Sequence, residues 1–334
     1  MDKITIVFSV DTTYFPYLCV AVQSIMENAS RDLRYEIVVL QSDLSARTRA
    51  KLERQVSEFS NFSLNFLDVS NLASEYGLDK LRVRKRFRVS AYYRLLIAHL
   101  LPNVDKVVYL DCDLAVLCDI AELFKVELGD NLLAAVEDRG VLTGWVKDPK
   151  FIPYLNGLGM KDVSWYFNSG VIVMNLAEIR RRELSKVFFD VARRNTCYFM
   201  DQNVLNVSCE GRVVHLDYEW NVQLSNPVEE DAPLKIIHYC GVKKPWMSFS
   251  AQFADEWWRY ARKTAMYEKM LFETVRRQFL PVTSRVALVV LKFRVLIWKY
   301  IYRISFGRMR LKLKERYKDE KMSYDTLVEL SVLT

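Results

Sequence analysis

Two carboxylates follow a hydrophobic run near the middle of the chain. The run Lys106–Leu110 has the sequence KVVYL, and Asp111 and Asp113 come directly after it with Cys112 between them. Because side chains alternate across an extended backbone, the two carboxylates face the same side. They repel each other unless a cation neutralises them, and Mg(II) and Mn(II) bind carboxylate and phosphate oxygens well. A surface turn produces the same D-x-D pattern by chance, so the motif alone leaves both interpretations open.

A histidine further along the chain is a candidate third ligand. The chain has three histidines, and His238 lies in IIHYCGVKKPW, where Gly241 and Lys244 follow it. An imidazole added to two carboxylates shifts the preference of a site from Mg(II) toward Mn(II). Gly241 allows a close backbone approach and Lys244 adds positive charge, as a bound diphosphate requires. The alternative is a strand-end histidine that hydrogen-bonds only to the backbone.

Strands and helices alternate over most of the chain. Apolar runs predict strands at Ile4–Val10, Tyr35–Leu40, Asn61–Leu67, Lys106–Leu110, Leu132–Val136, Phe167–Met174 and Leu234–Ile237. Helical spacing predicts helices at Tyr17–Asn28, Ser45–Phe59, Ser90–Leu101, Leu176–Arg194 and Asp201–Val207. This order is typical of an α/β fold with a mainly parallel sheet covered on both faces. Ligands of such sheets bind beyond the carboxyl ends of the strands, where Asp11 and Asp111 lie.

Composition places the chain among globular proteins. Its 334 residues are 51% hydrophobic and 27% charged, which excludes a disordered protein, a collagen-like repeat and a disulfide-framed mini-protein. The length predicts one main domain with an appendage. The six cysteines form no C-x-x-C pair, and four lie in apolar runs. We therefore expect reduced thiols and a cytoplasmic protein without an export signal.

Six motifs occur in the order and at the spacing found in one enzyme family. They are IVFSVDTTYFPYLCVAVQSI, VSAYYRLL, KVVYLDCDLAVL, YFNSGVIVMNL, MDQNVLN and HYCGVKKPW, and they span about residues 4–260. Together they resemble family 8 glycosyltransferases, and most of all the bacterial lipopolysaccharide galactosyl- and glucosyltransferases. The resemblance implies a GT-A fold, a UDP-galactose or UDP-glucose donor, and Mn(II), with Mg(II) as an alternative. It also implies hexose transfer, with retention at the anomeric carbon, to a lipopolysaccharide or lipooligosaccharide core.

The same resemblance assigns roles to individual residues. It makes Asp111, Asp113 and His238 the metal ligands. The residues implied to bind the rest of the donor are Ser9, Asp11 and Thr13 at the uracil and ribose, Arg94, Asp138, Asn168, Asp201 and Gln202 at the sugar, and Gly241 and Lys244 at the diphosphate. Asn203 departs from the pattern, because the family often has an acid there. This departure affects sugar contacts rather than the metal ligands.

The expected catalytic residues are Gln202, Asp201, Asp138 and Lys244. Breaking the bond to UDP leaves an anionic diphosphate, so the metal and Lys244 stabilise the leaving group. A double displacement needs a nucleophile close to the anomeric carbon. The residue implied there is Gln202, and an amide is a poor nucleophile. We therefore favour front-face attack, in which a leaving phosphate oxygen helps to deprotonate the acceptor, over a covalent intermediate on Gln202 or Asp201.

Positive charge gathers in two segments of the chain. Residues 80–88 contain six Lys or Arg, which fits either contact with a phosphorylated acceptor or a solvated loop. Residues 276–321 contain fourteen Lys or Arg against three acidic residues and surround an apolar run. Lys292, Arg294 and Lys299 interrupt that run, and each central charge disfavours a membrane-spanning helix by about 2.5–3.5 kcal/mol.

On a helix, one face of the second segment is basic. Arg285, Lys292, Lys299 and Arg303 share a narrow sector, which we call the basic ridge. An apolar body with such a ridge favours a helix lying on anionic lipid at the inner face of the cytoplasmic membrane. The alternatives are a dimer-packing helix and nucleic-acid binding, and the aliphatic content argues against the latter. The predicted organisation is a catalytic domain at 1–265 and a basic, apolar tail at 266–334.

Two other functional classes use similar features. Haloacid-dehalogenase-like phosphatases also end a strand in D-x-D, but they normally have Thr or Val two residues after the second Asp, where this chain has Ala115. A non-catalytic nucleotide-sugar-binding membrane protein is expected to have lost some metal ligands. All three candidate ligands are present, which favours an enzyme.

Overall fold

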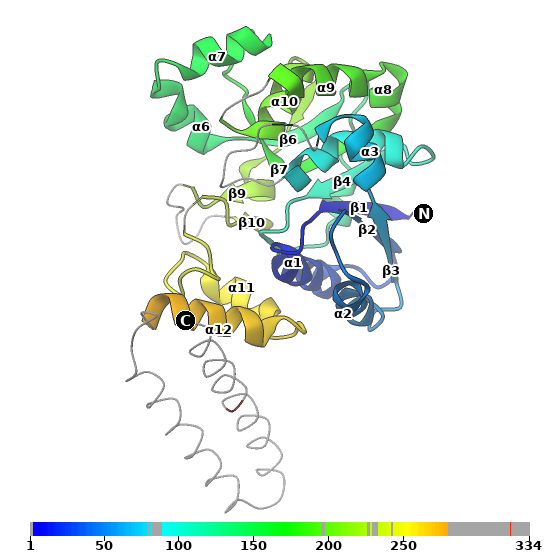
Figure 1. The fold of residues 1–334 in the computed structure, drawn as a ribbon, viewed down its shortest axis with the longest axis vertical. Coiled ribbons are helices and arrows are strands. Elements are labelled where there is room, and N and C mark those ends of the chain that lie inside the picture. Colours follow the sequence, from blue (N-terminus) through cyan, green and yellow to red (C-terminus); the bar gives the residue numbers. More distant parts are fainter. Residues whose placement is uncertain are drawn as a thin grey trace, which may run out of the picture.

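Two sheets and the helices around them form the described part of the protein. The computed structural model describes residues 3–78, 81, 89–194, 198–225, 228, 233–241, 243–279 and 321. The larger sheet has seven strands in the order β3-β2-β1-β4-β7-β6-β8, and the smaller has three in the order β5-β10-β9. Figure 1 shows the larger sheet in the upper part of the molecule, with α11 and α12 on its lower side.

Parallel pairing dominates the larger sheet. Its strands are β1 (Ile4–Ser9), β2 (Tyr35–Gln41), β3 (Phe62–Asp68), β4 (Lys106–Leu110), β6 (Leu133–Glu137), β7 (Phe167–Asn175) and β8 (Val213–His215). The pairs among β3, β2, β1 and β4 are parallel, as is the pair of β6 with β8. Strand β7 is antiparallel to both β4 and β6. The predicted mainly parallel sheet is confirmed, with β7 as the antiparallel exception.

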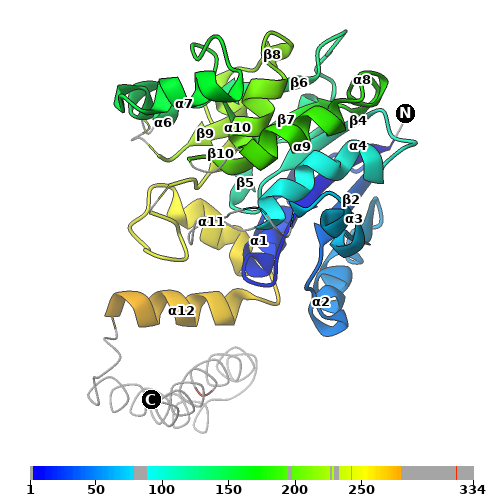
Figure 2. The ribbon, with the colours of Figure 1, turned by 45° about the horizontal axis from the view of Figure 1, so that its top comes forward.

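Helices cover both faces of this sheet (Figures 1 and 2). The α-helices among the described residues are α1 (Phe15–Asn28), α2 (Ala46–Val56), α3 (Ser70–Glu75), α4 (Ile97–Leu100), α5 (Ala121–Phe124), α6 (Arg139–Thr143), α7 (Phe151–Leu158), α8 (Leu176–Arg181), α9 (Leu184–Arg194), α10 (Met200–Ser208), α11 (Ala254–Ala261) and α12 (Tyr267–Phe279). The 3-10 helices in the same part of the chain are η2 (Val89–Leu96), η3 (Trp145–Lys147) and η4 (Tyr218–Asn221).

Alternate residues of each central strand enter different hydrophobic cores. In β1, Ile6 and Phe8 pack in the core that contains α1 and α11, whereas Val7 packs in the core that contains η2, α9 and α10. All three side chains are buried. A strand buried on both faces reads as a continuous apolar run, which explains why ITIVFS shows no polar alternation.

Two predicted helices differ from the structure. The predicted helix Ser90–Leu101 is the 3-10 helix η2 followed by the short α4. In a 3-10 helix residues three apart lie in line, and the Nε of Arg94 donates to the carbonyl of Ala91 at 3.0 Å. The predicted helix Leu176–Arg194 is divided into α8 and α9, because Glu183 has a φ of 52° and cannot continue a right-handed helix.

The smaller sheet brings the third candidate ligand to the D-x-D motif. It consists of β5 (Leu114–Val116), β9 (Val222–Gln223) and β10 (Ile236–His238). Strand β10 is antiparallel to β5 and pairs His238 with Leu114. The amide of Tyr239 donates to the carbonyl of Asp113 at 2.9 Å. The prediction ended the last strand at Ile237, whereas His238 is the last residue of β10, and its position is fixed by this pairing.

Helix α12 packs against the core that contains α1. Met266 and Met270 are buried in the core that contains α1, and the Thr274 hydroxyl donates to the carbonyl of Trp246 at 3.0 Å. The domain boundary at 265/266 stays a prediction. Apart from Leu81 and Lys321, the basic segment 80–88 and the chain after residue 279, which includes the basic ridge, lie outside the described residues.

No helix in the described part of the chain is long and apolar enough to cross a membrane. The five cysteines described are all free, and Cys19, Cys112 and Cys209 are buried. This agrees with the expected reduced thiols.

Candidate active site

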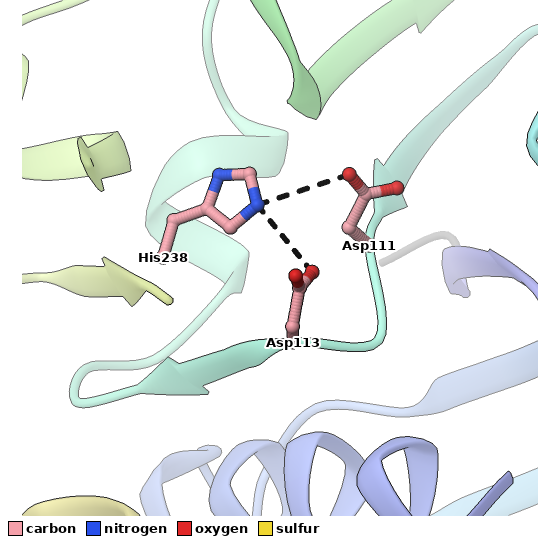
Figure 3. A group of neighbouring side chains, drawn as sticks. All are labelled: Asp111, Asp113 and His238. Carbon is pink, nitrogen blue, oxygen red and sulfur yellow. Dashed lines mark ion pairs between the residues drawn. The ribbon is translucent and has the colours of Figure 1, made fainter. Parts of the chain in front are cut away.

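Asp111, Asp113 and His238 form a compact cluster at the carboxyl end of β4. Their candidate ligand atoms all lie within 4.8 Å of one another. The Nε2 of His238 is 3.4 Å from Oδ1 of Asp113 and 3.8 Å from Oδ2 of Asp111. Figure 3 shows the imidazole facing both carboxylates, which come from the loop between β4 and β5. The structure thus brings together the three residues that the sequence predicts as metal ligands.

Each carboxylate of this cluster contacts a basic side chain through its second oxygen. The Nη2 of Arg94 is 2.7 Å from Oδ1 of Asp111, and the Nζ of Lys244 is 2.5 Å from Oδ2 of Asp113. The oxygens nearest His238 are the other two, Oδ2 of Asp111 and Oδ1 of Asp113. The two cations therefore fix the carboxylates and leave one oxygen of each directed toward the imidazole.

Burial and neighbouring charges shift the pKa values in this region. Burial opposes the ionisation of Asp113, but the charge of the neighbouring Lys244 outweighs it and holds the pKa of Asp113 well below its ordinary value. Burial also opposes the charge of Arg94, and the neighbouring carboxylates raise the pKa of this guanidinium above its ordinary value. Burial raises the pKa of Asp201 to about 6, although Arg94 opposes this shift. Asp113 and Arg94 are both charged at neutral pH.

Because Gly170 of β7 has no side chain, the cluster has room beside this strand. A Cβ at this position would lie 2.3 Å from Cε1 of His238 and 2.8 Å from Oδ2 of Asp111, closer than a side chain tolerates. Two carboxylates and one imidazole in such a cradle match the ligand preference of a hard or borderline divalent cation. The donor set of Asp111, Asp113 and His238 therefore fits a metal ion.

The predicted sugar-binding residues form a second polar network. Asp138 caps α6, and its Oδ1 accepts from the amide of Val141 at 2.9 Å. Its Oδ2 accepts from Nδ2 of Asn168 at 3.1 Å and from Nε2 of Gln202 at 3.0 Å. The Oε1 of Gln202 accepts from the amide of Ser169 at 3.0 Å. Asp138, Asn168 and Gln202 are therefore held together by bonds among their own side chains.

Arg94 joins the second network to the metal-site cluster. Its Nε lies 3.0 Å from Oδ2 of Asp201, and its Nη1 donates to the carbonyl of Ser169 at 2.5 Å. The same Asp201 oxygen accepts from the Ser169 hydroxyl at 3.1 Å. Because Arg94 also contacts Asp111, one buried guanidinium connects the two carboxylates.

The residues predicted to meet the nucleotide lie where β1 ends. The Ser9 hydroxyl oxygen is buried and has no hydrogen-bond partner among the described residues. The Ser9 carbonyl accepts from Sγ of Cys112 at 3.3 Å, which places the end of β1 beside the D-x-D loop. Asp11 follows and accepts from the amide of Tyr14 at 2.9 Å, and Thr13 is exposed just before α1. The Ser9 hydroxyl is therefore an unsatisfied, buried polar atom at the end of β1.

The turn after β10 places Lys244 next to Asp113. Gly241 has a φ of 91°, which favours glycine, and a Cβ there would lie 3.5 Å from the backbone of Ser225. The Nζ of Lys244 donates to the carbonyl of Tyr239 at 2.7 Å in addition to its contact with Asp113. Lys244 is thus anchored next to the candidate metal ligands, while Gly241 shapes the turn, and their predicted contact with a diphosphate stays a prediction.

Three residues of the site were not predicted from the sequence. Tyr109 donates to Oδ1 of Asp111 at 3.1 Å, and the period of two along β4 could have indicated this pair. Ser169 contacts the side chains of both Asp201 and Gln202. Asn221 lies 3.0 Å from Nδ1 of His238. No local pattern indicates Ser169 or Asn221, because their partners are distant in the sequence.

The sheet order, with the D-x-D loop at the carboxyl end of β4, agrees with the α/β fold class expected from the sequence. A family model described as glycosyl transferase family 8 matches residues 5–250. The chain belongs to this family. The predicted family and fold class are therefore confirmed.

The curated relatives include a lipopolysaccharide galactosyltransferase. The lipopolysaccharide 1,3-galactosyltransferase of Salmonella typhimurium is 27% identical over 284 residues, which cover 79% of each chain. General stress protein A of Bacillus subtilis is 24% identical over 78% of this chain and 93% of its own.

Solved structures show the same fold. The galactosyltransferase LgtC, solved in complex with donor and acceptor sugar analogues, has a TM-score of 0.65 and 26% sequence identity, over 78% of this chain and 96% of its own. The bifunctional glycosyltransferase WbbM has a TM-score of 0.71 and 29% identity, over 83% of this chain and 52% of its own, longer chain. This chain is similar to a glycosyltransferase domain in both.

Proposed function

We propose that this glycosyltransferase moves galactose or glucose from a UDP-sugar to a saccharide acceptor, with retention at the anomeric carbon. The observation that carries the proposal is the cluster of Asp111, Asp113 and His238 with Lys244 beside it. Such a cluster suits a divalent cation that also binds a diphosphate, and one nitrogen ligand favours Mn(II) over Mg(II). The proposed acceptor is a lipopolysaccharide or lipooligosaccharide core, which the Salmonella relative supports.

The residues around the cluster have distinct proposed tasks. A bound divalent ion supplies charge that stabilises the departing diphosphate. Lys244 adds a second cation on the same side, and its anchoring by the Tyr239 carbonyl limits its movement. Ser9, Asp11 and Thr13 bind the uridine, and the buried, unpartnered hydroxyl of Ser9 supports this assignment. Gly241 lets the backbone approach the diphosphate closely.

Front-face attack is the proposed route, because the nearby side chains are already engaged. Both ends of the Gln202 amide are hydrogen-bonded, to Asp138 and to the Ser169 amide. One Asp201 oxygen contacts Arg94 and the Ser169 hydroxyl. These contacts favour positioning roles over nucleophilic ones. In the proposed reaction the acceptor hydroxyl forms the new bond to the anomeric carbon as the bond to the UDP oxygen breaks, and its proton passes to that leaving oxygen.

Replacing Gln202 by Ala distinguishes the two routes. We expect a partial loss of transfer, of about 10- to 100-fold in kcat, because a positioning amide is lost while the leaving-group stabilisation remains. Single-turnover kinetics and mass spectrometry of the quenched enzyme provide the measurement. A near-complete loss together with a glycosyl adduct on wild-type Gln202 or Asp201 would refute front-face attack.

A donor screen tests the proposed function itself. UDP release is measured with UDP-galactose, UDP-glucose and UDP-N-acetylglucosamine, each with Mn(II), Mg(II) or a chelator, and with or without purified core oligosaccharide. The proposal predicts metal-dependent release with a hexose donor that rises when the acceptor is added. Hydrolysis of simple phosphate monoesters, with no use of any UDP-sugar, would instead support the haloacid-dehalogenase-like alternative.

The basic ridge leads to a prediction about location. We propose that residues 276–321 hold the enzyme on the inner face of the cytoplasmic membrane, where a lipid-linked acceptor is accessible. Each Lys or Arg near an anionic surface contributes about 1 kcal/mol, and salt screens this attraction. The full-length chain should therefore float with anionic vesicles, not with neutral ones, and be partly released by high salt.

A matched variant isolates the ridge. Changing Arg285, Lys292, Lys299 and Arg303 together to Gln should abolish flotation with anionic vesicles. The control changes the exposed Lys186 and Arg193 of the catalytic domain to Gln and should leave flotation unchanged. Equal binding of the wild type to neutral and anionic vesicles would contradict a peripheral, charge-dependent association.

A further inference from the structure

A chain of buried amides leads from the backbone of β7 to the imidazole of His238. Its members are Gly170, Asn168 and Asn221, and the residues Asn168, Asn221 and His238 are 7%, 0% and 3% exposed. Water therefore does not replace the hydrogen-bond partners within this series of amides. Each hydrogen bond must be satisfied by the next residue, so the orientation of each amide constrains the next one.

The first bond fixes the orientation of Asn168. The amide of Gly170 lies 2.9 Å from Oδ1 of Asn168, and a backbone N–H can only donate. The other end of the Asn168 side chain, Nδ2, lies 3.1 Å from a carboxylate oxygen of Asp138, which accepts. Both partners require the same orientation, so the oxygen of Asn168 faces Gly170 and its nitrogen faces Asp138.

Asn168 in turn fixes the orientation of Asn221. The oxygen of Asn168 lies 3.0 Å from the second amide, so Asn221 must present its NH₂ group there and donate. The oxygen of Asn221 then faces Nδ1 of His238 at 3.0 Å. A carbonyl oxygen only accepts, and Nδ1 must therefore carry the proton. In a neutral imidazole this leaves Nε2 with a free lone pair.

We propose that Asn221 is a positioning residue that holds His238 as the Nδ1–H tautomer, so that Nε2 is free to bind a metal ion. The free lone pair is directed to the side where Asp111 and Asp113 lie, because Nε2 is the nitrogen nearest both carboxylates. The distances of 3.4 and 3.8 Å exceed those of ordinary N–H···O bonds and give no reason to place the proton on Nε2. The choice of metal rests on the proposed function, but the tautomer does not.

The tautomer can be observed directly in the protein without metal. In long-range ¹H–¹⁵N spectra of the ¹⁵N-histidine-labelled full chain, neutral imidazole tautomers have distinct nitrogen shifts. Only His99, His215 and His238 contribute, and the signal lost in His238→Ala belongs to His238. At a pH where the ring is neutral, we expect protonated Nδ1 and unprotonated Nε2. A predominantly Nε2–H form would overturn the proposal whatever the variants do.

Two substitutions of Asn221 separate its hydrogen bond from its volume. Asn221→Leu keeps the size and removes the acceptor, so His238 should populate both tautomers. Loss of such an outer contact typically weakens metal binding about 10- to 100-fold, and we expect this for Mn(II) measured by electron paramagnetic resonance. Asn221→Asp keeps an acceptor for Nδ1–H and should preserve both the tautomer and the Mn(II) affinity to within a few-fold, although its second oxygen faces that of Asn168.

Asn206→Leu is the matched control. Asn206 is also a buried amide, 1% exposed, but it bonds to the backbone of Phe167 and Gln202. It should destabilise the fold without changing the His238 spectrum. Wild-type Mn(II) affinity in Asn221→Leu, or equal losses in Asn221→Leu and Asn206→Leu, would overturn the positioning role. If the wild type shows the Nδ1–H form but binds no divalent ion, the proposed function fails and the tautomer assignment stands.

Discussion

Replacing Asp113 by Asn or His238 by Ala is expected to reduce sugar transfer by about 10³-fold or more. Either change removes a ligand from a cluster whose donor atoms lie within 4.8 Å of one another, and the lost leaving-group stabilisation corresponds to several kcal/mol. Both variants should still fold, because a metal contributes to stability only when it is bound. Asp113→Asn also leaves Lys244 without its buried partner, so its free energy of unfolding should fall. Initial rates with the preferred UDP-sugar provide the measurement.

Asp190→Asn is the matched control for this experiment. Asp190 is an exposed carboxylate on α9, with 69% of its side chain accessible, and it pairs with a neighbouring surface arginine, Arg193, at 2.6 Å. Its loss should leave transfer unchanged. Circular dichroism and thermal unfolding show whether each variant is folded. Wild-type rates in a folded Asp113 or His238 variant would remove these residues from the active site.

The second large effect is expected at Arg94. Its side chain is 4% exposed and contacts Asp111 at 2.7 Å and Asp201 at 3.0 Å, and its guanidinium lies over the ring of Tyr109. Arg94→Met leaves two carboxylates without this cation. Removing one partner of a buried ion pair typically costs about 3–5 kcal/mol, and we expect a loss of that size in the free energy of unfolding in urea.

An exposed arginine gives the comparison. Arg181 on α8 forms a short contact with Glu178 at 2.6 Å, but 61% of its side chain is exposed. Surface ion pairs contribute about 0–1 kcal/mol, so Arg181→Met should have almost no effect on stability. If Arg94→Met destabilises the protein no more than Arg181→Met does, the buried network is not the structural link between the metal site and the sugar-binding residues.

The sequence predicts the parts of the site that depend on local pattern. Lys106–Leu110 reads as a buried strand, and the period of two puts Asp111 and Asp113 on the same side. Both predictions hold because a strand that is apolar throughout has few alternatives in an α/β fold. The link to His238 is different, because it depends on the pairing of β10 with β5 across more than a hundred residues. Its residue type and the Gly241 and Lys244 that follow make His238 a candidate ligand, and the family motifs assign it to the metal.

The shortest strands, and the residues that contact the candidate ligands from outside the cluster, could not be predicted from the sequence. Strands β5 and β9 have three and two residues, too few for any periodicity to be recognised, whereas the apolar run Leu234–Ile237 predicts most of β10. Asn221 reaches His238 only because β9 and β10 lie side by side. Glu183 divides α8 from α9 at a positive φ that its residue type does not indicate. In each case the tertiary contacts, and not the local propensity, determine the structure.

We expect UDP to bind through a divalent ion that Asp111, Asp113 and His238 would hold. Isothermal titration of UDP into the full-length protein, with Mn(II) and then with a chelator, tests this claim most directly. We expect binding at least about tenfold tighter with Mn(II), a difference of about 1.4 kcal/mol, and no such difference in Asp113→Asn. Equal UDP affinity of the wild-type protein in both conditions would contradict UDP binding through a divalent ion.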